Sequence, residues 1–266
     1  MSRVIKQCKE AVKFACAAVY SIVQPLAESR PRRVILYYHG VKPADRRMFE
    51  RQMAYLSGYC QVVNISEIKT ATADGADIIA AITFDDAFEN VLDNAVPILK
   101  TLNLPAAIFV PTGHLGRPQQ WPVPRGCDDK NEKIMTAEQV AGLARDGFEI
   151  CSHTVSHPKL TSLDEKRLYS ELVQSKKDLE AIIGKEVTAV SYPHGDHNAK
   201  VCAAARQAGY REGFTIEPQL VNDCRDDMRI GRFVVSPADG LVKFRLKVNG
   251  AYSISNCLRR VKNEQD

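Results

Sequence analysis

The chain has 266 residues and a formal net charge of +4 at pH 7, and 45% of its residues are hydrophobic and 26% charged. This composition is close to the soluble globular average and argues against a disordered or fibrous chain. Lysine and arginine are spread along the sequence instead of being clustered, so no specific signal supports nucleic-acid binding. The length suits one large α/β domain.

The N-terminal residues 1–33 combine an apolar run with a basic linker. Several lysines precede the apolar run 14–23, which has the length of a signal-peptide core and is too short to span a bilayer. A leading helix is slightly favoured, while a secretion signal and an interfacial membrane anchor stay open. The basic residues at 30–33 are interpreted as a solvated linker, with a patch for acidic lipid or polymer as the alternative.

The eight cysteines form no CxxC pair and no short framework spacing. Several lie in apolar stretches, where a free thiol packs as a small hydrophobic group. We interpret the cysteines as reduced, which favours a cytoplasmic protein. Disulfides, export and association with a membrane surface through the N-terminus are the alternatives.

From Val34 onward, short β-branched or aromatic runs alternate with longer segments of helical period. This alternation predicts parallel strands joined by crossover helices, as in a barrel. One domain is expected over 34–250, with a polar tail over 251–266. The predicted strands cover 34–38, 61–64, 78–84, 106–110, 148–151, 187–192, 213–216 and 233–235.

Three helices are marked clearly. Leucines recur at helical spacing over 163–183, and Gly184 supplies a C-terminal stop. A second helix is expected over 88–102 with a kink at Pro97. A third is expected from 137 to 147.

The longest irregular stretch is 111–133, which is rich in proline, glycine and charged residues. A loop of this length inside a compact domain is usually functional or mobile. It contains Trp121, the only tryptophan. A sugar-stacking platform and a loop anchor or lid residue are both open for this side chain.

Two adjacent carboxylates, Asp85 and Asp86, follow the apolar strand predicted over 78–84. The C-terminal ends of parallel strands form the functional rim of an α/β fold, so both acids are expected on that rim. A single aspartate would be read as a helix cap. Two in a row make a functional pair an equally good interpretation.

His153 and His157 stand at positions i and i+4 after the strand predicted over 148–151. In a turn, two imidazoles can converge on one ion, because neutral histidine nitrogen is a preferred ligand of zinc-like metals. With one carboxylate of the acid pair they would form a three-ligand site with an open position. The second carboxylate would then serve as a general base.

Three motifs resemble those of the polysaccharide deacetylases of the NodB-homology type, also called carbohydrate esterase family 4. Residues 83–86 (Thr-Phe-Asp-Asp) match the first motif, and 153–158 (His-Thr-Val-Ser-His-Pro) match the second. Residues 192–195 (Tyr-Pro-His-Gly) resemble the third. The similarity covers roughly residues 34–235.

The resemblance implies a distorted parallel (β/α) barrel of about seven strands. It implies hydrolysis of acetamido groups on N-acetylglucosamine-type saccharides, with Asp85 as the general base. One divalent metal ion, with zinc expected and cobalt or nickel as alternatives, would be held by Asp86, His153 and His157. The third motif would contact the saccharide through Tyr192, Pro193, His194 and Gly195.

Residues 37–41 (Tyr-Tyr-His-Gly-Val) also resemble an element of the subgroup that includes poly-N-acetylglucosamine deacetylases. This similarity points to exopolysaccharide or cell-envelope glycan metabolism.

Two departures separate the chain from the family's pattern. Ser191 takes the place of the arginine that often begins the third motif and orients the base, and Arg232 is a candidate substitute. The late Leu-x-His motif, whose histidine protonates the leaving amine, is absent because no histidine follows His197. His39 is expected to replace that acid, with His194 as the next candidate; an ordinary polar rim role is open for both.

Two other functions stay open. One is hydrolysis of another acyl substrate, such as an O-acetyl ester or a cyclic amide, and the other is a catalytically impaired barrel that binds glycans. The complete set of acids and histidines argues against a pure binder, which has little need of a base beside the metal. No pattern indicates the oligomeric state or the chain length of the glycan.

Overall fold

The computed structural model describes residues 11, 14–15, 17–18, 31–122 and 132–253. Residues 11, 14–15 and 17–18 are helical, and Ala17 packs against Leu246 and Ala251. The rest of the predicted apolar run 14–23 and most of the polar tail lie outside the described residues. The solvated linker predicted at 30–33 is wrong for Arg32 and Arg33, because they begin strand β1 (Arg32–Tyr38), where Arg33 donates to the carbonyls of Ile68 and Ala71. Within the described part, no helix is both long and apolar enough to cross a membrane.

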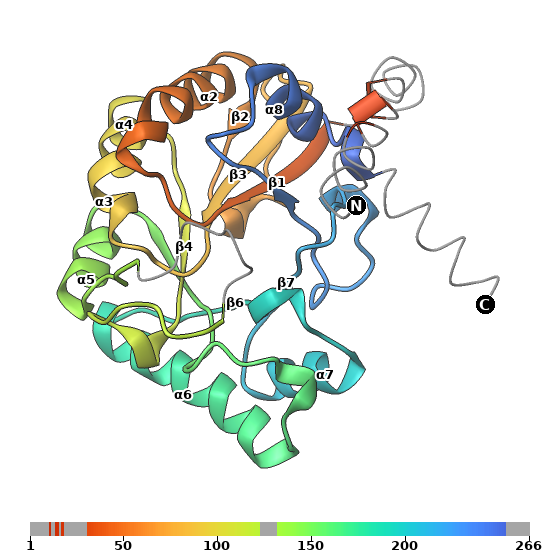
Figure 1. Ribbon diagram of the computed structural model, residues 1–266. Coiled ribbons are helices and arrows are strands. Elements are labelled where there is room, and N and C mark those ends of the chain that lie inside the picture. The colour runs from red at the N-terminus through yellow and green to blue at the C-terminus, as the bar shows by residue number, and fades with distance from the viewer. Residues whose placement is uncertain (1–10, 12–13, 16, 19–30, 123–131, 254–266) are drawn as a thin grey trace, which may run out of the picture.

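A parallel sheet curls into an open barrel whose outer face is covered by helices (Figure 1), which confirms the predicted fold class. The strand order is β7-β6-β5-β4-β3-β1-β8, and β2 pairs with β3 beside this path. The strands are β1 (Arg32–Tyr38), β2 (Gln61–Val62), β3 (Ile78–Phe84), β4 (Ala107–Val110), β5 (Glu149–Ser152), β6 (Ala189–Ser191), β7 (Glu212–Phe214) and β8 (Phe233–Val234).

Alternate residues of the strands build two apolar layers. On β1, Val34 and Leu36 face the helices, while Ile35 belongs to the cluster that fills the barrel interior. All seven residues of β3 are buried, as expected for a strand covered on both faces. The helices are α2 (Arg46–Tyr59), α3 (Asn90–Asn94), α4 (Val96–Thr101), α5 (Ala137–Arg145), α6 (Glu165–Ile183), α7 (Ala199–Gln207) and α8 (Leu241–Val248).

Helix α6 forms close to where it was predicted, because a capping residue stands at each of its ends. The Asp164 side chain accepts a hydrogen bond from the Arg167 amide at 2.8 Å, which caps the first turn. Gly184 ends the helix in the left-handed region, with φ 67°.

The single kinked helix predicted over 88–102 is wrong, because the segment forms two short helices, α3 and α4. The break lies at Ala95, and Pro97 stands in the first turn of α4. Proline suits that position, since its missing N–H would have no partner within the helix there. The predicted strands 61–64 and 187–192 are also too long, because β2 ends at Val62 and β6 covers only Ala189–Ser191.

Cys60, Cys151, Cys202 and Cys224 are free thiols. The other four cysteines lie outside the described residues, so the prediction of a fully reduced chain is checked for these four alone.

Candidate metal and catalytic centre

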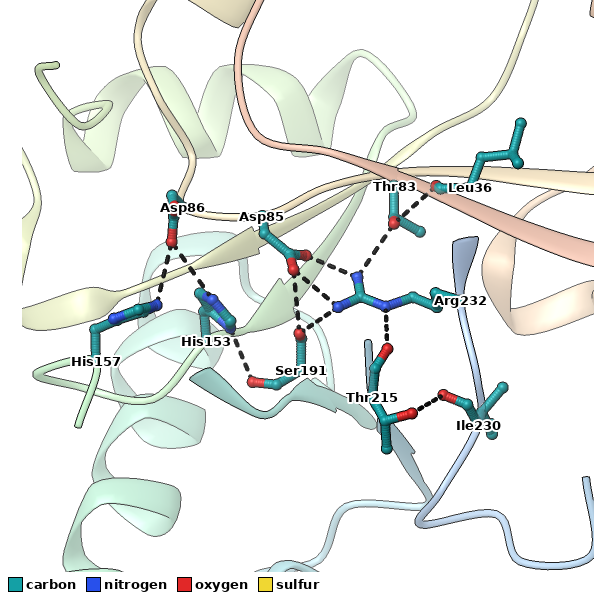
Figure 2. Close-up of polar contacts among 10 residues, drawn as sticks. All are labelled: Leu36, Thr83, Asp85, Asp86, His153, His157, Ser191, Thr215, Ile230 and Arg232. Atoms are coloured by element: carbon teal, nitrogen blue, oxygen red, sulfur yellow. Dashed lines mark hydrogen bonds and ion pairs between the residues drawn. The ribbon is translucent and has the colours of Figure 1, made fainter. Parts of the chain in front are cut away.

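The two adjacent acids turn in different directions at the C-terminal end of β3. The Asp85 amide still bonds the Tyr38 carbonyl at 2.9 Å, as a continuation of the strand. Asp86 and Ala87 then take left-handed backbone conformations, with φ 68° and 51°. Such conformations are uncommon for non-glycine residues and cluster at functional sites. Asp85 consequently faces Arg232, and Asp86 faces two histidines (Figure 2).

Asp86, His153 and His157 converge on one point. Asp86 Oδ1 lies 3.4 Å from Nε2 of His153 and 3.4 Å from Nε2 of His157. All three side chains are buried, and Asp86 Oδ1 has no hydrogen-bond partner within the described chain. Zinc holds such ligand atoms at about 2.0–2.2 Å in a tetrahedron, which sets two of them roughly 3.4 Å apart. Both Asp86–histidine distances match this spacing, and all three ligand atoms lie within 4.8 Å of one another, so the cluster fits a divalent metal ion.

The turn that carries the two histidines is pinned from helix α6. The Glu171 carboxylate accepts hydrogen bonds from the backbone amides of Val155 and Ser156, at 2.9 and 2.8 Å, and from the Ser156 hydroxyl at 2.5 Å. Thr154 and His157 take positive φ values of 66° and 54° within this turn. The carboxylate holds the backbone in a shape that brings both imidazoles to the same side.

The ring orientation of His153 is set by Ser191. The Nδ1 atom of His153 donates to the Ser191 carbonyl at 2.8 Å, because a carbonyl can only accept. The proton on Nδ1 leaves the lone pair of Nε2 directed at Asp86. Histidines that bind metals are ordinarily fixed by such a bond from their second nitrogen.

Both Asp86 and His157 are held in the protonation states that metals require. Burial raises the pKa of Asp86, but the neighbouring imidazoles of His153, His39 and His157 lower it to about 2. Burial, followed by the charge of His153, lowers the pKa of His157 to about 3. At neutral pH the site offers a carboxylate and a neutral imidazole.

Asp85 forms a two-pronged ion pair with Arg232. The guanidinium nitrogens lie 2.7 and 2.8 Å from Oδ1 and Oδ2 of Asp85, and one of them also donates to the Ser191 hydroxyl at 2.7 Å. Burial raises the pKa of Asp85, yet the charges of Arg232 and His153 outweigh it and lower the pKa overall. The carboxylate is therefore ionised and fixed in orientation.

Arg232 is wholly buried, and its remaining donors are satisfied. Its Nε atom donates to the Thr215 carbonyl at 3.1 Å, and another nitrogen donates to the Thr83 hydroxyl at 3.2 Å. The guanidinium carbon also lies 4.7 Å from the ring centroid of Tyr37. Delocalised guanidinium charge suits such a site, because it can bond a carboxylate and pack on aromatic faces together.

Residues 72–213 match the family described as polysaccharide deacetylase. The chain belongs to the polysaccharide deacetylase family. The matched range contains both acids and both histidines of the centre. His39 and Arg232 lie outside it, on either side.

Relatives with this family name support the assignment over a larger part of the chain. The chain is 28% identical over 212 residues to YxkH of Bacillus subtilis strain 168, provisionally named a polysaccharide deacetylase, and the match covers 76% of this chain and 71% of that protein. It is 29% identical over 161 residues to the poly-beta-1,6-N-acetyl-D-glucosamine N-deacetylase of Staphylococcus aureus strain MSSA476. That match covers 58% of this chain and about half, 53%, of the staphylococcal protein.

Two solved structures share the fold. The deacetylase PplD of Streptococcus pyogenes, in complex with acetate, matches with a TM-score of 0.69 and 21% identity, covering 83% of this chain and 99% of PplD. IcaB from Ammonifex degensii matches with a TM-score of 0.66 and 23% identity, covering 84% of this chain and 97% of IcaB.

His39 and His194, the two candidates for the general acid, both lie at the rim of the predicted metal site. His39 is half-buried just after β1, and its charge acts on both Asp85 and Asp86. His194 is exposed, and its ring centroid lies 4.6 Å from that of His157. The structure thus keeps both residues close to the predicted metal site.

The residues of the third motif, which were predicted to contact the saccharide, differ in how far they are exposed. The Tyr192 side chain is 1% exposed, and its hydroxyl donates to the Met228 carbonyl at 3.1 Å, so the side chain packs within the fold. Pro193 is also buried. Gly195 has φ 67°, and a Cβ atom there would lie 2.3 Å from Ile216. Of this motif, His194 alone presents an exposed side chain.

The sequence left the role of Trp121 open, and the structure places this residue beside the predicted metal site. Its ring stacks on the ring of the predicted ligand His157, with centroids 4.1 Å apart and an interplanar angle of 25°. One face of the indole is therefore occupied by His157. Only the general importance of the long loop could have drawn attention to this residue beforehand.

Proposed function

We propose that this chain is a metal-dependent hydrolase that removes N-acetyl groups from N-acetylglucosamine-type saccharides. One observation carries the proposal: a buried Asp-His-His cluster lies beside a second carboxylate that is ionised and bound by an arginine. That pairing supplies a metal site and a base in one place. The poly-beta-1,6-N-acetyl-D-glucosamine N-deacetylase named among the relatives supports the substrate class.

Asp86, His153 and His157 would hold one divalent ion, with zinc expected and cobalt or nickel as alternatives. When bound, such an ion polarises a carbonyl and lowers the pKa of water. Three protein ligands leave a position open for substrate or water, as in catalytic zinc sites.

Asp85 is the proposed general base. It takes a proton from the water that attacks the acetamido carbon, and the C–N bond then breaks to give acetate and a free amine. Arg232 binds both oxygens of Asp85, and the Ser191 hydroxyl donates to Oδ2 at 3.4 Å, so that the carboxylate does not turn toward the metal ligands. Arg232, which directly precedes β8, would therefore orient the base, the role that the arginine of the family's third motif has.

His39 is the proposed acid that protonates the leaving amine, and His194 is the alternative. Position at the C-terminal end of β1 supports His39, because β1 lies beside β3 and its acid pair. Proximity to His157 supports His194. We further propose a role in exopolysaccharide or cell-envelope glycan metabolism, in a cytoplasmic protein that can associate with a membrane surface through its N-terminus.

The test is acetate release from β-1,6-linked N-acetylglucosamine oligomers by metal-loaded protein, with the free amine measured in parallel. Equal amounts of acetate and amine are expected, because hydrolysis of an acetamide yields one of each. Acetate from O-acetylated sugars without any amine would instead support the rival esterase. Binding of the oligomers without any product would support a glycan-binding barrel.

His39→Ala is expected to lower kcat by about 10²-fold or more while leaving metal content unchanged, since general acids contribute on that scale. His194→Ala in the same assay is the matched variant. If His194→Ala causes the loss and His39→Ala does not, the roles of these two histidines are exchanged.

A further inference from the structure

The two predicted histidine ligands are supported in different ways. His153 bonds the Ser191 carbonyl through Nδ1, whereas Nδ1 of His157 is buried and has no hydrogen-bond partner in the described part of the chain. A ligand histidine without such a bond lacks the usual restraint on its ring. Some other contact must keep the His157 ring in place.

Trp121 supplies that contact. Its indole lies flat against the His157 ring, and the His114 ring meets the indole edge-on, with centroids 5.1 Å apart and an interplanar angle of 78°. His114 is itself buried, and neither of its ring nitrogens has a partner among the described residues. In this arrangement His114 packs as an aromatic ring, and it keeps the indole against the ligand.

The described part of the loop that carries Trp121 is hydrogen-bonded to neighbouring segments. The Gln119 side chain donates to the Trp121 carbonyl at 2.6 Å, and the Gln119 amide bonds the Glu132 carbonyl at 2.8 Å. At the start of the loop, the Gly113 amide bonds the Val155 carbonyl at 2.9 Å. A Cβ atom on Gly113 would lie 2.8 Å from that carbonyl oxygen, so glycine permits the close approach.

We propose that Trp121 is a positioning residue for the metal site, which fixes the His157 ring by stacking in place of the missing hydrogen bond. The inference rests on the proposed function, because it needs a metal ion at Asp86, His153 and His157. Trp121 itself offers no metal ligand; it raises metal affinity by holding one ligand ready.

The test is metal affinity, measured by competition between the protein and a chromophoric chelator for zinc and for cobalt. Trp121→Ala is expected to weaken binding by about 10-fold or more, the scale on which groups that orient metal ligands act. Trp121→Phe should restore most of the affinity, because a phenyl ring can stack on His157. Tyr59→Ala, an exposed aromatic on α2, is the matched control and should leave the affinity unchanged.

Fluorescence gives a second readout, since Trp121 is the only tryptophan. Cobalt should quench the emission saturably, with the midpoint found by chelator competition, because the ion binds beside the indole. Zinc should saturate the site without comparable quenching.

The outcomes separate the two proposals. Failure of the unaltered protein to bind either metal overturns the proposed metal site. Tight binding by the unaltered protein with equal affinity in folded Trp121→Ala overturns the role of Trp121 alone. Folded Trp121→Phe that binds as weakly as Trp121→Ala also contradicts stacking as the cause.

Discussion

Asp85→Asn is expected to lower kcat for acetate release by about 10²- to 10⁴-fold, because an amide cannot take the proton from the attacking water. Metal content should be unchanged, since Asp85 lies beside the ligand cluster and is not part of it. Steady-state kinetics together with metal analysis of the purified variant make the measurement. A loss confined to kcat would separate the base from the ligands.

Asp146→Asn is the control for this prediction, because it makes the same chemical change in an exposed ion pair with Lys100. The control should retain full activity. Asp85→Asn with unaltered kcat and full metal content would show that another group acts as the base. Asp86→Asn should differ from both by losing metal.

Arg232→Met is expected to destabilise the fold by about 3–5 kcal/mol, because it leaves the Asp85 carboxylate buried without its counter-charge. Asp85 is 3% exposed and Arg232 is 0% exposed, so water cannot replace the lost contact. The variant also removes the donors to Thr215 and Ser191. Urea unfolding of metal-free protein measures the free energy without a contribution from bound metal.

Arg206→Met is the matched control, because Arg206 forms an ion pair with Asp226 at the surface. Exposed pairs contribute about 0–1 kcal/mol, so this variant should unfold almost as the parent does. Arg232→Lys keeps the charge and loses the paired bonds, and it should fall between the two. Equal unfolding free energies for Arg232→Met and Arg206→Met would contradict the proposed coupling of Arg232 to Asp85.

The sequence predicted those parts of the fold and site that depend on local pattern. The bounds of β3 could be predicted because a strand buried on both faces forms a nearly continuous apolar run, which only Thr83 interrupts here. The two acids and two histidines were placed together because parallel strands deliver their C-terminal ends to one rim. Helix α6 was found from its leucine spacing and terminal glycine.

Local pattern failed where the backbone or the packing departs from a regular element. Pro97 was expected to bend one helix, but it is the second residue of a new helix, α4, because a proline fits both a kink and the first turn of a helix. Tyr192 was predicted to contact the saccharide because it stands in the family's third motif. In the structure its side chain points inward, to the Met228 carbonyl. The motif alone does not determine the direction of this side chain, because β6, the strand before it, has only three residues.

The remaining partners come from parts of the chain that are distant in sequence. Arg232 meets Asp85 across 147 positions, and no local pattern around Arg232 marks it as buried. Trp121 reaches His157 from a long loop whose path depends on backbone bonds to Glu132 and Val155. Tertiary contacts alone determine where Arg232 and Trp121 lie. The sequence could therefore name Arg232 as a candidate and leave two roles open for Trp121, but it could not predict either contact.

The most direct test of the account is reconstitution of metal-free protein with one equivalent of zinc, cobalt or nickel, followed by acetate release from N-acetylglucosamine oligomers. We predict no release without metal, and activity that rises with bound metal and levels off at one ion per chain. His157→Ala should bind little metal and stay inactive. Full acetate release by protein shown to be free of metal would contradict the account.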